Sequence, residues 1–188
     1  MSKVEFDCGK WLQEAEEFAL PNWSALPSIP LYMDQVMMFT GEALSLFERD
    51  EKQSLLTNSM INNYVKSGVV DHPVHKKYSK EHLSKLMMVG LLKQVLSIQD
   101  IAVLFSGDED AEQLYKDFAA AQSGALHETA AGVHPESDAA ALRAAALKLA
   151  AEATARQAVA QRILMALSDE KKAKKIIKFV TNKSLHGA

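Results

Sequence analysis

Polar and basic side chains between residues 58 and 77 have the types and the spacing that hydrogen-bond an anionic partner. The positions that carry them are Asn58, Ser59, Asn62, Asn63, Lys66, His75, Lys76 and Lys77. Amide and hydroxyl groups donate to phosphate oxygens and also read base edges, whereas lysine and histidine contact the charged backbone. The chemistry expected of this set is therefore recognition of a nucleic acid, with the amides and the hydroxyl near base edges or phosphates.

A short helix is predicted to present the first five of these residues. Thr57, Asn58 and Ser59 form a cluster of residue types that cap helix N-termini. The apolar residues that follow have the spacing of one buried helix face, namely Met60, Ile61, Tyr64 and Val65. Gly68 is the residue type that commonly comes directly after a helix. The sequence therefore predicts a helix from Asn58 to Lys66.

The segment after this helix is predicted to be a small β-hairpin. Val69 and Val70 are β-branched, and a proline-containing segment, Asp71–Lys76, separates them from Lys77 and Tyr78. Two short extended segments around such a turn indicate a hairpin, or wing. The histidine and the lysines of this wing would then face the nucleic acid as hydrogen-bond donors.

Two more helices are predicted downstream of the hairpin. Ser79 is expected to cap the first, and one face of that helix carries Leu83, Leu86, Met87, Gly90, Leu91 and Val95. Ser97 and Asp100 approximate a capping box for the second helix. The inward residues of that helix are expected to be Ile101, Leu104 and Phe105.

The charge distribution separates this stretch from the rest of the chain. The whole chain has 21 basic and 24 acidic residues and a net charge of -3. Residues 52–99 contain seven lysines against Asp71 and Glu81, whereas residues 1–51 contain three basic and ten acidic residues. A basic segment in an acidic chain is typical of a surface that meets a polyanion. The alternative is that these lysines only solvate exposed helix faces.

The chain before residue 58 is predicted to contain two helices joined by an extended connector. The first lies within residues 1–20, and its apolar face carries Trp11, Leu12, Ala15, Phe18 and Ala19. Three prolines exclude a helix from the connector Ala19–Pro30. Four connector residues are apolar enough to lie along the main body, namely Leu20, Trp23, Leu26 and Ile29. The second predicted helix spans Leu31–Phe47.

The C-terminal part is predicted to be helical with interruptions. Asp108–Ala121 has a helical pattern, Gln122–Asp138 has the composition of a linker, and residues 169–185 form a last helix. Between them, the alanine-rich stretch Ala139–Leu167 is rich in helix formers. Its heptad positions are Leu142, Leu149, Arg156 and Ile163, and Ala146, Ala153, Ala160 and Leu167. Such a seam suits close packing on a neighbouring helix or on a second copy.

Catalytic and cofactor-binding motifs are absent from the sequence. It has no glycine-rich phosphate loop and no serine nucleophile elbow, and its one cysteine, Cys8, forms neither a disulfide framework nor a metal cluster. His72 and His75 have a spacing that could hold a metal, but no acidic or cysteine partner completes that site. We therefore expect a protein that is not an enzyme and binds no cofactor or metal. No signal peptide or long apolar run is present, which favours a cytoplasmic protein without a membrane partner.

The order of these elements resembles the MerR-type winged helix-turn-helix of bacterial regulators. The matching motifs are Tyr64 with Gly68-Val69, Lys76-Lys77-Tyr78-Ser79, and Leu96-Ser97-Ile98-Gln99-Asp100-Ile101. Over about residues 29–105 the chain resembles most closely the bacterial domain-of-unknown-function family 1836. The MerR-type resemblance implies a mainly α fold, with a winged helix-turn-helix, a β-hairpin wing and additional N- and C-terminal helices. It also implies a DNA-binding transcription regulator that forms a homodimer through its C-terminal helices, with Ala139–Leu167 as the candidate dimer element.

Two departures from the MerR-type pattern leave other functions open. Asn62 and Asn63 stand where that family usually has Arg and Tyr, and Glu48–Leu56 replaces a short turn between the first two helices. The alternatives are a helical protein-interaction module and a sensor of an unknown effector ligand. The expected division of the chain is an N-terminal helix and connector at residues 1–30, a winged-helix domain at 31–106 and a C-terminal helical region at 107–188.

Overall fold

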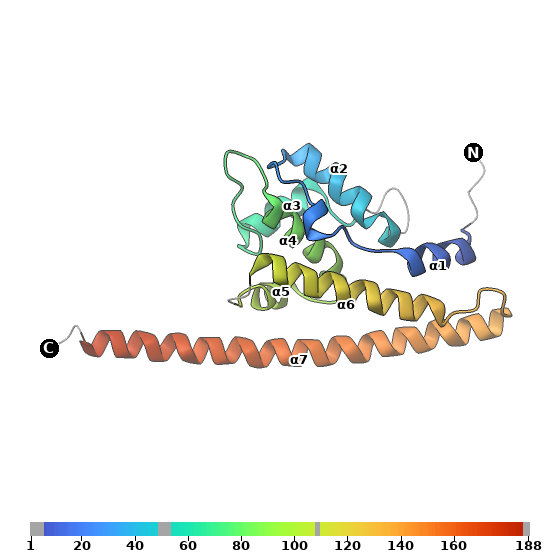
Figure 1. Ribbon diagram of the computed structural model, residues 1–188. Coiled ribbons are helices and arrows are strands. Elements are labelled where there is room, and N and C mark those ends of the chain that lie inside the picture. Colours follow the sequence, from blue (N-terminus) through green and yellow to red (C-terminus); the bar gives the residue numbers. More distant parts are fainter. Residues whose placement is uncertain (1–5, 49–53, 108–109, 186–188) are drawn as a thin grey trace.

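Helices form most of this protein. The computed structural model describes the backbone of residues 6–48, 54–107 and 110–185, and the side chains of these ranges up to residue 170. Figure 1 shows the helices in chain order. Their bounds are α1 Cys8–Glu17, η1 Trp23–Ala25, α2 Met33–Leu44, η2 Ser45–Phe47, α3 Asn58–Lys66, α4 Lys80–Leu92, α5 Ile98–Leu104, α6 Ala111–Ala131 and α7 Ala139–Leu185, where η marks a 3-10 helix.

The prediction of a β-hairpin wing is wrong. The described residues contain no β-strand, and their strand-like pairing is limited to isolated antiparallel bridges. One bridge joins Val74 to Lys77 within the loop, and the other joins Leu31 to Tyr78. The winged helix-turn-helix fold expected from the MerR-type resemblance is therefore corrected to a helical domain that carries one long loop between α3 and α4.

The hairpin does not form because the residues of its first predicted strand, Val69 and Val70, form the hydrogen bonds that end α3. Val69 and Val70 are buried, and both donate their N–H groups to the carbonyl of Tyr64, at 3.0 and 3.2 Å. These donors are therefore unavailable for a strand ladder. Tyr78, on the other predicted strand, pairs with Leu31 instead, because that residue lies just before α2 with a free backbone edge.

Helix α4 is the centre of the hydrophobic core. It packs against α2 on one side and against α6 on another. The contact with α2 is close at Gly90, where a Cβ atom would lie 3.1 Å from Leu44 Cδ1 and 3.4 Å from Leu56 Cγ. The predicted core face of α4 is confirmed from Leu83 to Leu91, whereas Val95 lies beyond the helix and is 42% exposed.

Two hydrogen bonds fasten the N-terminal segment to α6. The Tyr115 hydroxyl donates to the carbonyl of Pro21 at 2.8 Å, and His127 Nε2 lies 2.6 Å from the carbonyl oxygen of Phe18. Helix α1 packs against α6 as well, with Leu12 buried as predicted. The connector is therefore held along the body by specific polar contacts and not only by apolar burial.

The prediction for the connector is confirmed at three of its four apolar residues. Leu20 and Leu26 are buried, and Trp23 is half-buried against the core. Ile29 differs, because 75% of its surface is exposed. The connector also contains η1, a short 3-10 turn, where the sequence predicted an extended chain throughout.

Both caps predicted after the basic loop are confirmed. The N–H of Ser79 donates to His82 Nδ1 at 3.0 Å at the start of α4. At the start of α5, Ser97 Oγ accepts from the N–H of Asp100 at 3.1 Å, and the Asp100 carboxylate accepts from the N–H of Ser97 at 3.3 Å. These reciprocal bonds satisfy donors that a helix N-terminus leaves without partners.

The predicted ends of the first two C-terminal helices are wrong. Helix α6 continues to Ala131, across residues 122–131 of the predicted linker, and α7 is one helix of 47 residues where two were expected. The predicted start at Ala139 and the predicted end at residue 185 are confirmed. No glycine or proline occurs between Ala139 and Leu185, so the alanine-rich propensity carries the helix across Ser168. Although α7 is long, no helix in the described ranges is apolar enough over its length to cross a membrane.

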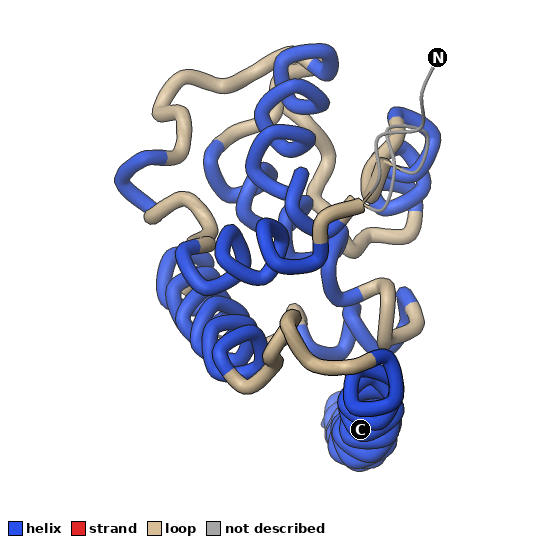
Figure 2. Tube along the Cα trace, turned by 90° about the vertical axis from the view of Figure 1, so that its right-hand side faces the viewer, coloured by secondary structure: helices blue, strands red, loops and turns tan. Residues whose placement is uncertain are grey.

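Helix α7 lies along the other helices as a separate rod. Figure 2 shows it nearly end-on below them, and Figure 1 shows it running past α5. Gln157 Nε2 donates to the carbonyl of Val95 at 2.7 Å, and Leu164 is buried. One flank of α7 remains exposed and carries Val159, Ile163 and Leu167, which follow one another at intervals of four.

One hydrophobic core includes residues from all three predicted parts of the chain. Leu26 precedes the expected boundary at residue 30, Met87 lies between the boundaries, and Tyr115 follows the boundary at residue 106, yet all three belong to the same core. The division into three parts stays a prediction about folding units.

Candidate nucleic-acid interface

Helix α3 presents a polar face to solvent and buries the opposite face. Thr57 caps it, since its hydroxyl oxygen accepts from the N–H of Met60 at 3.2 Å. Ile61, Tyr64 and Val65 are buried. All five candidate residues on this helix are exposed, and they are Asn58, Ser59, Asn62, Asn63 and Lys66. The structure therefore brings these five side chains to one accessible face, as the spacing predicted.

The end of α3 fixes the direction in which the chain leaves it. Gly68 has a φ of +76°, a left-handed conformation that residues with a Cβ rarely adopt. The chain then forms a loop, residues 71–79, which we call the basic loop. Figure 1 shows this loop rising from the end of α3 along the side of the molecule opposite α1. Helix α3 and the basic loop thus occupy the same end of the domain.

An ion pair anchors the start of the basic loop to α4. Lys85 Nζ lies 2.7 Å from Asp71 Oδ2. The hydrogen bond from Lys85 is the main reason that the pKa of Asp71 is lowered from its ordinary value. Because the Asp71 charge is taken up by Lys85, it does not neutralise the lysines further along the loop.

The tip of the basic loop is a tight turn with an unusual backbone. His75 and Lys76 have φ angles of 51° and 62°, and the N–H of Lys77 donates to the carbonyl of Val74 at 2.9 Å. Two successive left-handed residues in a hydrogen-bonded turn define a type I′ turn, which usually contains Asn and Gly. Each residue with a Cβ in this conformation costs about 1–2 kcal/mol. The turn therefore holds two exposed basic side chains at the expense of backbone strain.

Lys77 is oriented by an aromatic residue from outside the loop. Its Nζ lies 4.9 Å from the centroid of the Tyr32 ring, within the range of a cation–π contact. Lys80, at the start of α4, similarly lies 5.3 Å from the ring of Trp23. Tyr32 and Trp23 were not among the predicted site residues. No sequence signal pointed to them, because both contacts join segments that are far apart in the sequence.

A small cavity of about 350 Å³ lies beneath the turn. Its lining includes Pro30, Val74 and His82. The N–H of Ser79 can only donate, so His82 Nδ1 is the acceptor and the neutral ring carries its proton on Nε2. That buried Nε2 has no hydrogen-bond partner among the described residues. The base of the turn thus combines apolar walls with one unused donor.

The described side chains do not assemble a metal centre at this end of the molecule. Within that part of the chain, no group of three or more His, Cys, Asp or Glu residues lies close enough together to hold an ion. His75 is exposed in the turn, and His72 is exposed in the loop before it. The chemistry that the arrangement offers is hydrogen bonding by amides and charge contacts by lysines.

The fold and this surface define a small helical domain with a polar helix and a basic loop at one end. The family described as a domain of unknown function (DUF1836) matches residues 21–118, and the chain belongs to that family. The match starts in the connector and ends within α6, so it contains the whole candidate interface. No curated protein and no solved structure matches the chain.

Proposed function

We propose that this protein binds double-stranded DNA through α3 and the basic loop and acts as a transcription regulator. The observation that carries the proposal is the exposed face of α3, where three asparagines, a serine and a lysine stand clear of the core. Asparagine side chains hydrogen-bond both phosphates and adenine edges. The proposal requires neither a wing nor a relationship to MerR-type regulators.

The basic loop adds two lysines to the single lysine of α3. Lys76 and Lys77 lie at or beside the turn, and Lys66 lies at the end of α3. The acidic residue of the loop is held by Lys85. Lys66 and Lys76 are exposed and Lys77 is half-buried over Tyr32, and none of the three pairs with a carboxylate among the described residues. Lysines of this kind displace counterions from DNA phosphates and so supply affinity without sequence preference.

The turn geometry favours a binding role over simple solvation. A hydrogen-bonded turn and a lysine placed over Tyr32 lose less conformational entropy on binding than freely rotating surface lysines. Lysines that only keep a surface soluble need no such support. The structure of the turn is therefore better explained by a partner that contacts it.

A homodimer through α7 is part of the proposal. The exposed flank of Val159, Ile163 and Leu167 has the i, i+4, i+8 spacing of a helix-packing stripe. A second copy with the same stripe would bury these residues, since two-fold interfaces use one patch on both subunits. Two copies would also present two α3 faces to one DNA duplex.

A salt series with random duplex DNA tests the proposal. If about three cations per protomer contact phosphates in a dimer, the log–log slope of affinity against salt is about -5, and affinity falls by about 10³ between 50 and 200 mM salt. The Lys76→Glu/Lys77→Glu double variant should bind more weakly and with a flatter slope. Fluorescence anisotropy of a labelled duplex measures both quantities.

The matched control is the Lys10→Glu/Lys148→Glu double variant. It makes the same change of net charge on α1 and α7, at exposed lysines far from the candidate interface in sequence. It should retain the wild-type slope. Absence of binding at low salt, or equal losses in the two double variants, would overturn the proposal.

A protein-interaction module is the second candidate function, and one observation favours it. Ile29, Tyr32 and Val74 are 75%, 53% and 67% exposed. Val74 lies in the turn, Tyr32 lies beside Lys77, and Ile29 precedes Pro30, which lines the cavity at the turn together with Val74. Apolar side chains beside lysines suit an acidic peptide better than a duplex. Loss of peptide binding in a Val74→Ser variant that binds DNA normally would assign this surface to a protein partner.

A further inference from the structure

A groove with both apolar and polar walls runs between the end of α4 and α7. It consists of two adjoining cavities of about 710 and 480 Å³. The two cavities share Leu92, Val95 and Gln122, so they are continuous along the end of α4. Phe47 and Leu55 line the first cavity, and Leu149 lines the second. Volumes of this size are typical of small-molecule sites.

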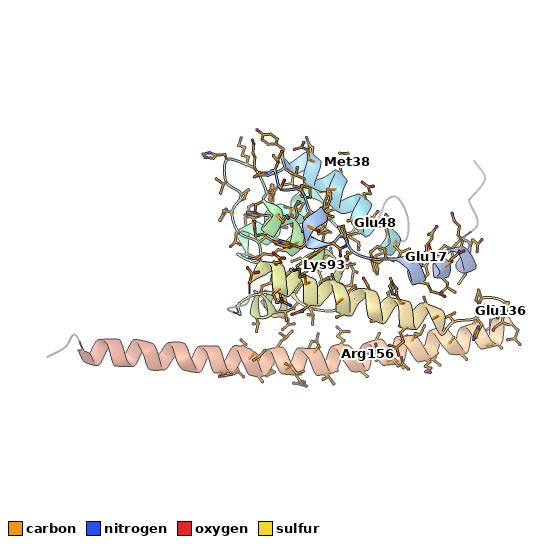
Figure 3. The ribbon with its side chains drawn as sticks, in the orientation of Figure 1. Glu17, Met38, Glu48, Lys93, Glu136 and Arg156 are labelled. Carbon is orange, nitrogen blue, oxygen red and sulfur yellow. The ribbon has the colours of Figure 1, made fainter. Side chains whose placement is uncertain are left out.

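The two cavities differ in charge. Lys93 is the charged residue that lines the first, whereas Arg156 and Glu152 both line the second. Figure 3 shows Lys93 beside α6 and Arg156 on α7 below it. Lys93 Nζ lies 3.3 Å from the Met60 sulfur. Within the described part of the chain, no carboxylate pairs with Lys93.

The ammonium of Lys93 lacks a partner of adequate strength. A thioether sulfur is a weak acceptor, and an ammonium carries three donors. Burial lowers the pKa of Lys93, which means that its charged form has lost part of its hydration without gaining an anion. The amide side chains of Gln94 and Gln122 line the same cavity and provide further polar atoms around this position.

The shape and the charge together define one class of ligand. A free phosphate would pair with Lys93 but would leave the leucine-lined walls uncovered. A neutral apolar molecule would cover the walls but would leave the ammonium without a partner. A carboxylate with an aliphatic chain satisfies both requirements, since its head accepts from Lys93 and its tail covers Leu92, Val95 and Leu149.

We propose that this groove binds an amphipathic carboxylate, with the head at Lys93 and the chain directed along the end of α4 between α6 and α7. The site lies between the family domain and α7, and it goes beyond the proposed DNA contact. It does not depend on DNA binding, so each proposal can fail without the other.

Calorimetric titration of the full chain with sodium decanoate tests the site. The comparison probe is decyltrimethylammonium, which has the same tail and the opposite charge. Decanoate should bind one molecule per chain, at least about tenfold more tightly than the cationic probe, because a charge-assisted hydrogen bond contributes more than a neutral one. Lys93→Met should weaken decanoate by at least about tenfold, whereas Lys10→Met, a change at an exposed lysine of α1, should not.

A steric pair of variants locates the chain of the ligand. Ala153 lines the second cavity, and Ala144 is an exposed alanine on the same helix that does not line it. Ala153→Trp should abolish decanoate binding, and Ala144→Trp should leave it unchanged, with both variants retaining the helical circular dichroism of the wild type. Equal affinity for the two probes, unchanged binding in Lys93→Met or in Ala153→Trp, or no binding by the wild type would each overturn the proposal.

Discussion

Leu31 and Tyr78 exchange two backbone hydrogen bonds, each 2.8 Å long, across 47 positions of sequence. This pair joins the chain just before α2 to the end of the basic loop. Their neighbours Tyr32 and Lys77 consequently meet on the outer side, where the lysine lies over the ring. The end of the basic loop is therefore positioned by its pairing with Leu31, and not by a hairpin of its own.

Relief of the strain in the turn should stabilise the protein and weaken DNA binding at the same time. The variant His75→Asn/Lys76→Gly places the preferred residues of a type I′ turn at the two positions with positive φ. The free energy of unfolding should increase by about 1–3 kcal/mol, because two strained residues are replaced. The same change removes basic groups that we place on DNA. Urea unfolding and anisotropy on one preparation measure the two effects.

This variant is informative because its stability is expected to rise while its DNA affinity falls. Greater stability with unchanged DNA affinity would show that the turn does not contact DNA. Lower stability would show that the positive φ angles are not the conformation of the turn in solution. A Lys66→Ala variant is the control for loss of one cation without a change in backbone strain, because Lys66 lies in the last turn of α3.

Gly68→Ala should destabilise the protein. Gly68 has a φ of +76° and an open environment around its Cα, so the cost is backbone strain alone, about 1–2 kcal/mol. Gly124→Ala is the matched control, since Gly124 lies inside α6 and a Cβ added there would also meet nothing within 4 Å. That change should stabilise by about 0.5–1 kcal/mol. Equal effects of the two changes in urea unfolding would contradict the assigned end of α3.

Features that depend on nearby residues could be predicted from the sequence. Thr57 and Gly68 bound α3, and Ser97 with Asp100 begins α5, because each cap acts within a few positions of itself. The exposed face of α3 followed from helical spacing. The continuity of α7 could also have been predicted, since no glycine or proline separates its two proposed halves.

Features that depend on distant pairing could not be predicted in the same way. Tyr78 has the pattern of a hairpin strand, but its partner Leu31 is far away in sequence. The contact of Lys77 with Tyr32 follows from that pairing, so it had no separate sequence signal. The type I′ turn could not be predicted from the sequence either, because neither of its central residues is the Asn or Gly that usually occupies such a turn.

Gly90→Val should separate α2 from α4 and destabilise the core. A Cβ at this position already approaches Leu44 and Leu56 closely, and two methyl groups would have no room. Overpacking of this kind typically costs about 1–3 kcal/mol. Gly41→Val is the control, because Gly41 lies in α2 with nothing within 4 Å of its Cβ position. Urea midpoints that fall equally for both variants would contradict the close approach of the two helices at Gly90.

Tyr115 should make the stability of the protein fall at high pH. Burial raises the pKa of Tyr115 to about 12, from an ordinary value of 10.0. The folded state therefore holds the phenol proton more tightly than the unfolded state does. This contribution is complete below pH 10 and is lost as the pH rises from 10 towards 12. Burial raises the pKa values of Tyr64 and Tyr78 as well, so their contributions decline in the same direction above pH 10.

Tyr115→Phe separates the contribution of the hydrogen bond to Pro21 from the contribution of the raised phenol pKa. At neutral pH the variant loses the hydrogen bond to the carbonyl of Pro21, and its free energy of unfolding should be lower by about 1 kcal/mol. Between pH 10 and 12 its stability should fall less steeply than that of the wild type, because one phenol with a raised pKa is gone. Urea unfolding at a series of pH values measures both differences. An alkaline slope identical to that of the wild type would show that the Tyr115 phenol titrates normally and that the connector does not bury it in solution.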